Sequence, residues 1–146
     1  MDAQKLRSLY DFSGRTAVVT GGTRGIGRAV AEGLAAAGAN VVVASRKADA
    51  CAETQAHLES MGTDALGVAI NMGDADSADR LVAAAVDRFG GIDIVVNNAA
   101  NALAAPVGQQ SDAAWQKSFE VNLRGPALLT QAAVPHLAAS GSATVV

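Results

Sequence analysis

Short apolar runs rich in β-branched residues recur along the chain, and longer stretches with helical spacing of alanine, valine and leucine separate them. This pattern predicts alternating strands and helices. The predicted strands are Thr16–Thr20, Asn40–Ser45, Ala65–Ile70 and Ile92–Asn97, followed by the beginning of a fifth at Ala143–Val146. The predicted helices are Gly25–Ala37, Lys47–Met61, Ser77–Phe89 and Ser111–Leu137.

The predicted strands do not alternate polar with apolar residues, and Asn40–Ser45 is almost entirely apolar in its middle. Such strands are typical of a parallel sheet covered on both faces. Right-handed crossovers would place the first three strands in one direction and the fourth on the other side of the first. We therefore expect residues 1–146 to form one α/β domain, a doubly wound parallel sheet with helices on both faces, incomplete at the fifth strand.

The last predicted helix contains Gly125-Pro126 in its middle. Proline lacks a backbone donor and clashes with the preceding turn, so the sequence predicts a kink or break near Asn122–Gly125.

Composition narrows the possibilities. The chain has 146 residues, 50% of them apolar and 3% aromatic, and a formal net charge of −3 with acids and bases interspersed. These values favour a globular domain, and the charge pattern shows no basic cluster of the kind that binds nucleic acid.

The first residues, Met1–Arg7, do not resemble a secretion signal, no window suits a membrane span, and Cys51 is the only cysteine. A cytoplasmic location is expected.

The segment Thr20-Gly21-Gly22-Thr23-Arg24-Gly25-Ile26-Gly27 joins the first predicted strand to the first predicted helix. Small residues at such a turn let the backbone approach a phosphate, and the free N–H groups and dipole of the helix attract the anion. The motif favours a diphosphate site. A tight turn without a ligand is the alternative.

Ser45-Arg46 ends the second strand, about 20 residues beyond the glycines, where an acid usually binds the ribose 2′-hydroxyl of NAD. A guanidinium here suits a 2′-phosphate instead, and Arg24 adds a second positive charge. The pair predicts a preference for NADP(H) over NAD(H), unless both arginines are solvated surface residues. Two other features are weaker signals of a binding site. The segment Asn97-Asn98-Ala99-Ala100 could equally be an amide-rich turn, and Asn122 could be a surface residue of a helix.

In this order and spacing, Thr20-Gly21-x-x-x-Gly25-x-Gly27, Asn97-Asn98-Ala99 and Val121-Asn122 resemble the short-chain dehydrogenase/reductase family from about Ser13 onward. The resemblance implies a Rossmann-type NAD(P)(H) oxidoreductase that moves a hydride between nicotinamide and the carbon of a small-molecule carbonyl or alcohol. A methyltransferase with a related fold is less favoured, because its ligand carries no phosphate for the two arginines. No metal site is expected.

The resemblance also implies roles for individual residues. Asn122 matches the catalytic asparagine of the family. The positions implied to contact the cofactor are Gly21, Thr23, Arg24, Gly25, Ile26, Gly27, Ser45, Arg46, Asn71, Met72, Asn98, Ala99, Ala100 and Val121. Two of these depart from the family pattern: Asn71 replaces an aspartate beside adenine but keeps an amide oxygen as acceptor, and Ala100 replaces a glycine.

The serine, tyrosine and lysine that complete the family's catalytic group have no counterpart in the 146 residues, and Tyr10, the only tyrosine, precedes the first predicted strand. We therefore expect a fragment that carries the cofactor-binding half and is inactive alone, from a full-length form that is a homo-oligomer. The alternatives are a non-catalytic dinucleotide-binding module and a degenerate gene product.

Overall fold

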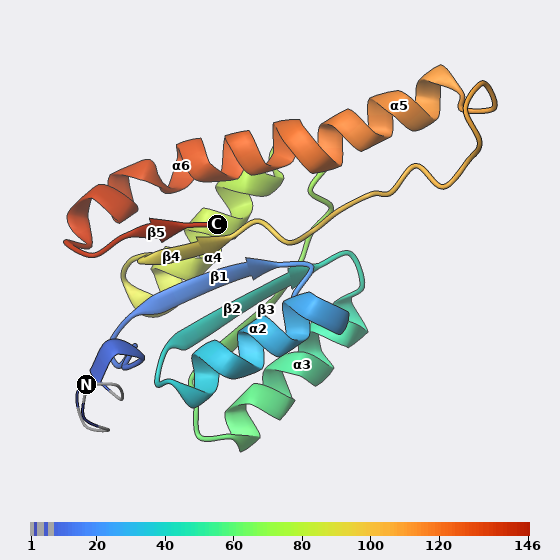
Figure 1. Cartoon of the computed structure of the whole chain (residues 1–146). Coiled ribbons are helices and arrows are strands. Elements are labelled where there is room, and N and C mark those ends of the chain that lie inside the picture. Colours follow the sequence, from blue (N-terminus) through green and yellow to red (C-terminus); the bar gives the residue numbers. More distant parts are fainter. Residues whose placement is uncertain (1, 3–4, 6–7) are drawn as a thin grey trace.

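The computed structural model describes residues 2, 5 and 8–146. Its centre is a parallel sheet in the order β3-β2-β1-β4-β5 (Figure 1). The strands are β1 (Thr16–Thr20), β2 (Asn40–Ser45), β3 (Ala65–Ala69), β4 (Ile94–Val96) and β5 (Thr144–Val145). This order, with the fourth strand beside the first and away from the second and third, confirms the predicted doubly wound sheet.

Helices cover both faces of the sheet (Figure 1). They are α2 (Gly25–Ala36) and α3 (Ala48–Ser60) on one face, and α4 (Ser77–Phe89) and α6 (Gly125–Ala139) on the other. Two neighbouring residues of β1 show why its sequence is apolar throughout. Val19 joins a buried cluster with Ala31 and Leu58, whereas Val18 joins a second cluster that contains Leu81 and Leu129. Successive side chains of a strand point to opposite faces, so both must be apolar.

The chain stays helical through the region where the sequence predicts a kink or break, so no break occurs, but the regular α-helix is interrupted there. α5 (Asp112–Phe119) leads into a π-helical turn, η1 (Glu120–Arg124), and then directly into α6 (Figure 1). The N–H of Gly125 donates to the Glu120 carbonyl, five residues earlier, so the wider turn accommodates the missing donor of Pro126. A Cβ on Gly125 would lie 2.7 Å from the Met72 carbonyl oxygen, so glycine also lets the helix approach the end of β3.

Smaller differences concern the ends of elements. β4 is shorter than predicted, because Ile92 is buried in the core but precedes the paired residues.

No helix among the described residues is long and apolar enough to cross a membrane. Residues 1, 3–4 and 6–7, part of the segment in which the sequence predicts no secretion signal, lie outside the described residues.

Candidate functional site

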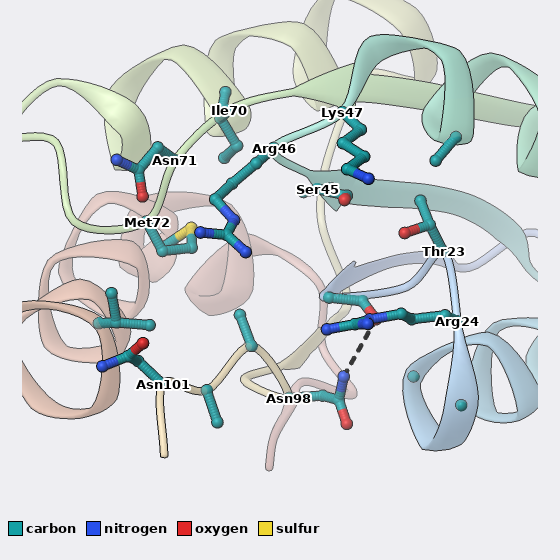
Figure 2. Close-up of a pocket in the computed structure, with 18 of the residues that line it drawn as sticks. Thr23, Arg24, Ser45, Arg46, Lys47, Ile70, Asn71, Met72, Asn98 and Asn101 are labelled. Atoms are coloured by element: carbon teal, nitrogen blue, oxygen red, sulfur yellow. Dashed lines mark hydrogen bonds between the residues drawn. The ribbon is translucent and has the colours of Figure 1, made fainter. Parts of the chain in front are cut away.

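A cavity of about 830 Å³ opens at the carboxyl ends of β1, β2, β3 and β4 (Figure 2). In a doubly wound sheet the ligand binds at the carboxyl ends of the strands, because the loops after β1 and its neighbours diverge there to opposite faces of the sheet. All predicted cofactor-contacting residues line this cavity: Gly21, Thr23, Arg24, Gly25, Ile26, Gly27, Ser45, Arg46, Asn71, Met72, Asn98, Ala99, Ala100 and Val121.

The glycines of the loop between β1 and α2 have two different surroundings. A Cβ on Gly27 would come within 2.3 Å of both the Gly21 carbonyl oxygen and Asn98 Nδ2, and one on Gly21 within 2.8 Å of Asn98 Nδ2. Gly25 has a φ of +54°, and a Cβ there would meet nothing within 4 Å. Gly21 and Gly27 therefore allow the loop to close on β4, whereas Gly25 leaves open space at the amino end of α2.

A hydrogen-bond network ties this loop to the end of β4. The Thr20 hydroxyl donates to the Val96 carbonyl (3.3 Å) and accepts from the N–H groups of Asn98 (3.1 Å) and Ala99 (3.0 Å). Asn98 Nδ2 donates to the carbonyls of Thr20 (2.9 Å) and Gly21 (3.2 Å). The side chain of Asn98 thus holds the glycine loop in place, and Figure 2 marks one of these contacts.

Four cationic side chains line the cavity, and no Asp or Glu does. Arg24 enters from the glycine loop, Arg46 and Lys47 come from the end of β2 (Figure 2), and Lys117 comes from α5. None of the four forms a salt bridge with another described residue. The protein as a whole carries a net charge of −3, so this concentration of positive charge is local. It suits a ligand with several anionic groups.

The end of the cavity beside β3 combines apolar walls with one amide. Ile70 and Met72 flank Asn71 along the chain, and all three line the cavity (Figure 2). Asn71 Nδ2 donates to Asp74 Oδ1 at 2.9 Å, and Asn71 Oδ1 accepts from the N–H of Gly73 at 3.2 Å. These contacts fix which end of the amide carries the oxygen.

Asn122, the predicted catalytic residue, does not line the cavity. Its Oδ1 accepts from the N–H of Asn101 at 2.7 Å, and its Nδ2 donates to the Asn101 carbonyl at 2.9 Å and to the Ser118 hydroxyl at 3.0 Å. The side chain therefore holds the segment that follows β4, which does line the cavity. Pro126 lies four residues after Asn122 and cannot donate to its carbonyl, so this acceptor loses its usual helical partner.

Sequence reasoning missed Lys47 and Lys117. Lys47 directly follows Arg46 after the end of β2. Extending the search for cationic residues by one position beyond Arg46 would have found it. Lys117 precedes Val121 by four residues, which places both on one face of a helix. That spacing is a usable signal, although the π-helical turn between them could not be foreseen.

Two other side chains are excluded from the chemistry of the cavity. Cys51 is 2% exposed, and its thiol lies 3.4 Å from the Val68 carbonyl and 3.6 Å from the Ser45 carbonyl. Burial raises the pKa of the Cys51 thiol, which disfavours the reactive thiolate. Tyr10 is exposed and precedes β1, so it lies near the amino ends of the strands, whereas the cavity lies at their carboxyl ends. It therefore cannot transfer a proton in the cavity.

Comparison with known sequences identifies a family. The sequence model of the family described as short chain dehydrogenase matches residues 15–146. "Dehydrogenase/reductase SDR family member 4" from Homo sapiens is 40% identical over 136 residues, which cover 92% of this chain and 49% of that protein. The chain spans about half the length of the curated relatives it matches.

Solved structures agree in fold. A putative short-chain alcohol dehydrogenase from Sinorhizobium meliloti 1021 is 37% identical with a TM-score of 0.87, and the match covers 93% of this chain and 54% of that one. L-sorbose reductase from Gluconobacter frateurii, solved with NADPH and L-sorbose, is 34% identical with a TM-score of 0.89, covering 93% and 52%. At these identities, sequence and fold support the same family.

Proposed function

The chain belongs to the short-chain dehydrogenase/reductase family of oxidoreductases, and we propose that it forms the NADP(H)-binding part of a reductase or dehydrogenase. The bound nicotinamide would exchange a hydride with the carbon of a small carbonyl or alcohol substrate. The residues of this chain would bind and orient the cofactor.

The glycine loop fits the diphosphate. The open space at Gly25 lies at the amino end of α2, where free N–H groups and the helix dipole attract an anion. No acidic residue lies in the first turn of α2 to compete for those groups. The Thr20–Asn98 network fixes the loop before any ligand binds, so little ordering is required on binding.

The observation that carries the preference for NADP(H) is the set of cations around the cavity. Arg24, Arg46 and Lys47 gather near the end of β2, with the hydroxyls of Thr23 and Ser45 close by (Figure 2). A free 2′-hydroxyl needs a single acceptor, which a carboxylate would supply, whereas a 2′-phosphate needs several donors. The absence of Asp and Glu among the described lining residues favours the phosphate.

Two structural relatives support this assignment. L-sorbose reductase was solved with NADPH, and a metagenomic short-chain oxidoreductase was solved with NADP. The latter is 30% identical to this chain with a TM-score of 0.85.

Asn122 would act as a positioning residue for the other half of the cofactor. Its side chain fixes Asn101, and Asn101 lines the cavity on the β4 side, away from the cations of β2. We propose that the 146 residues alone bind the cofactor without turning over a substrate. Tyr10, the only tyrosine, precedes β1 and so lies near the amino ends of the strands, whereas the cavity lies at their carboxyl ends. Steady-state carbonyl reduction by the purified chain would contradict this.

A direct test is titration of the chain with NADPH and NADH, followed by nicotinamide fluorescence. We expect NADPH to bind at least about tenfold more tightly, and Arg46→Asp to reduce that ratio by about 10- to 100-fold, because it replaces a phosphate donor by a ribose acceptor. Arg124→Asp makes the same charge change at an exposed residue outside the cavity and should leave the ratio unchanged. An unchanged ratio in Arg46→Asp would remove that residue from the phosphate site.

A further inference from the structure

We propose that the base-binding end of the cavity accepts a 6-oxopurine about as well as adenine, because Asn71 offers both a donor and an acceptor there. This specificity goes beyond NADP(H) binding and rests on it. The groups concerned are Asn71, its flanking residues Ile70 and Met72, and the cations Arg46 and Lys117.

The order of the strands places the base. If the diphosphate lies at the end of β1 and the additional phosphate at the end of β2, the purine on the same ribose must lie beyond β2, at the end of β3. The nicotinamide half then extends in the other direction, toward β4. At the end of β3 the side chains of Ile70 and Met72 line the cavity (Figure 2), and the small exposed part of each, 5% and 8%, is apolar surface that a flat ring could contact.

The hydrogen-bonding groups at this end do not select for an exocyclic amine. A 6-amino group needs an acceptor, and a carboxylate would supply one while repelling a 6-oxo group. No carboxylate is among the described residues that line this cavity, and Arg46 and Lys117 are donors only. Asp74 and Glu120 line a neighbouring depression that shares Asn71 and Lys117, and Asp74 Oδ1 already accepts from Asn71 Nδ2. Asn71 is therefore the side chain at the end of β3 that can meet either kind of purine.

Asn71 keeps both capacities despite its internal contacts. The amide nitrogen uses one N–H on Asp74 and retains a second, and the amide oxygen uses one acceptor position on the N–H of Gly73 and retains another. A 6-amino group can donate to the free position of Oδ1, and a 6-oxo group can accept from the free N–H of Nδ2. Neither requires the amide to rotate, and Asn71 is exposed to the cavity.

The experiment compares NADPH with its 6-oxo analogue, in which hypoxanthine replaces adenine. Both carry the same fluorescent nicotinamide, so their dissociation constants with the purified chain come from one titration method and need no enzymatic turnover. We expect the two constants to agree within about threefold. A loss of tenfold or more for the 6-oxo analogue would overturn the inference.

The variant Asn71→Asp sharpens the test. The carboxylate keeps the acceptor and loses the donor, so binding of the 6-oxo analogue should fall by about tenfold or more relative to NADPH. Gln131→Glu adds the same charge at an exposed position of α6 outside the cavity and should leave the ratio unchanged. Equal binding of both dinucleotides by Asn71→Asp would show that the base does not contact residue 71.

The outcomes separate this inference from the proposed function. If neither dinucleotide binds the folded wild-type chain, NADP(H) binding itself is wrong. If NADPH binds and the 6-oxo analogue is rejected, only the base specificity is wrong. Far-ultraviolet circular dichroism of each variant verifies that a lost signal reflects binding rather than unfolding.

Discussion

The two halves of the cavity rim are built differently. On the β1–β4 side, backbone and side chains are interlocked: Thr20 is buried, and Asn98 bonds directly to the glycine loop. On the β2–β3 side, Arg46, Lys47 and Asn71 are exposed, and the two cations have no salt-bridge partner among the described residues.

This contrast separates two tasks. The interlocked side fixes backbone groups, which can bind a diphosphate only if the loop already has the correct shape. The open side provides long side chains whose hydrogen-bonding groups remain available for a ligand. Substitutions on the interlocked side should therefore affect stability and binding together, whereas substitutions on the open side should affect binding alone.

The largest effect should come from Gly27→Ala on the interlocked side. The new Cβ would meet the Gly21 carbonyl oxygen and Asn98 Nδ2, each 2.3 Å away, so the loop or the helix must move. We expect the free energy of unfolding to fall by about 2–4 kcal/mol and NADPH binding to be lost. Urea denaturation measures the first effect and fluorescence titration the second.

Gly33→Ala is the matched control, because it lies in the same helix and a Cβ there would meet nothing within 4 Å. This exposed helical site should gain up to about 1 kcal/mol from the substitution. Equal stability of the Gly27→Ala and Gly33→Ala variants would mean that the loop is not interlocked with β4.

Thr20→Val should have the next largest effect. Valine matches the shape of threonine, but it removes the acceptor for the N–H groups of Asn98 and Ala99. We expect a loss of about 2 kcal/mol in urea denaturation, with weaker NADPH binding. Thr16→Val is the control in the same strand: this residue is also buried, and its hydroxyl makes no hydrogen bond to the described residues, so its loss should be smaller.

Gly25→Ala should change stability least. Nothing lies within 4 Å of the new Cβ, so the cost is that of an alanine at a φ of +54°, about 1 kcal/mol. NADPH affinity should nevertheless fall at least about tenfold, because the methyl group occupies the space proposed for the diphosphate. Unimpaired NADPH binding by Gly25→Ala would place the diphosphate elsewhere.

The strands were predictable because a strand covered on both faces has an apolar run of limited length. β1 and β2 match their predicted bounds. The continuity of the last helix was not predictable, because a proline after Arg124-Gly125 is compatible with both a break and a π-helical turn. Gly125 packs closely against the Met72 carbonyl, and this contact joins residues far apart in sequence that a local pattern does not bring together.

The same distinction applies to the site. The glycine spacing and the strand ends predicted which residues surround the cavity, since topology brings the ends of parallel strands together. The orientation of side chains was not predictable: Asn98 bonds to the loop and Asn122 to the backbone of Asn101, and both contacts depend on three-dimensional structure. Lys117 lines the cavity from α5, whereas the sequence had pointed only to Val121 and Asn122 of the last predicted helix.

Binding of NADP(H) in this strand-end cavity through the glycine loop can be followed residue by residue in an NMR titration of the isotope-labelled chain with NADPH. We expect the largest amide shift changes at Gly25, Ile26 and Gly27, with a second group at Ser45, Arg46 and Lys47. NADH should affect the second group less. Saturable binding with no shift at Gly25–Gly27, or no binding by the folded chain, would contradict it.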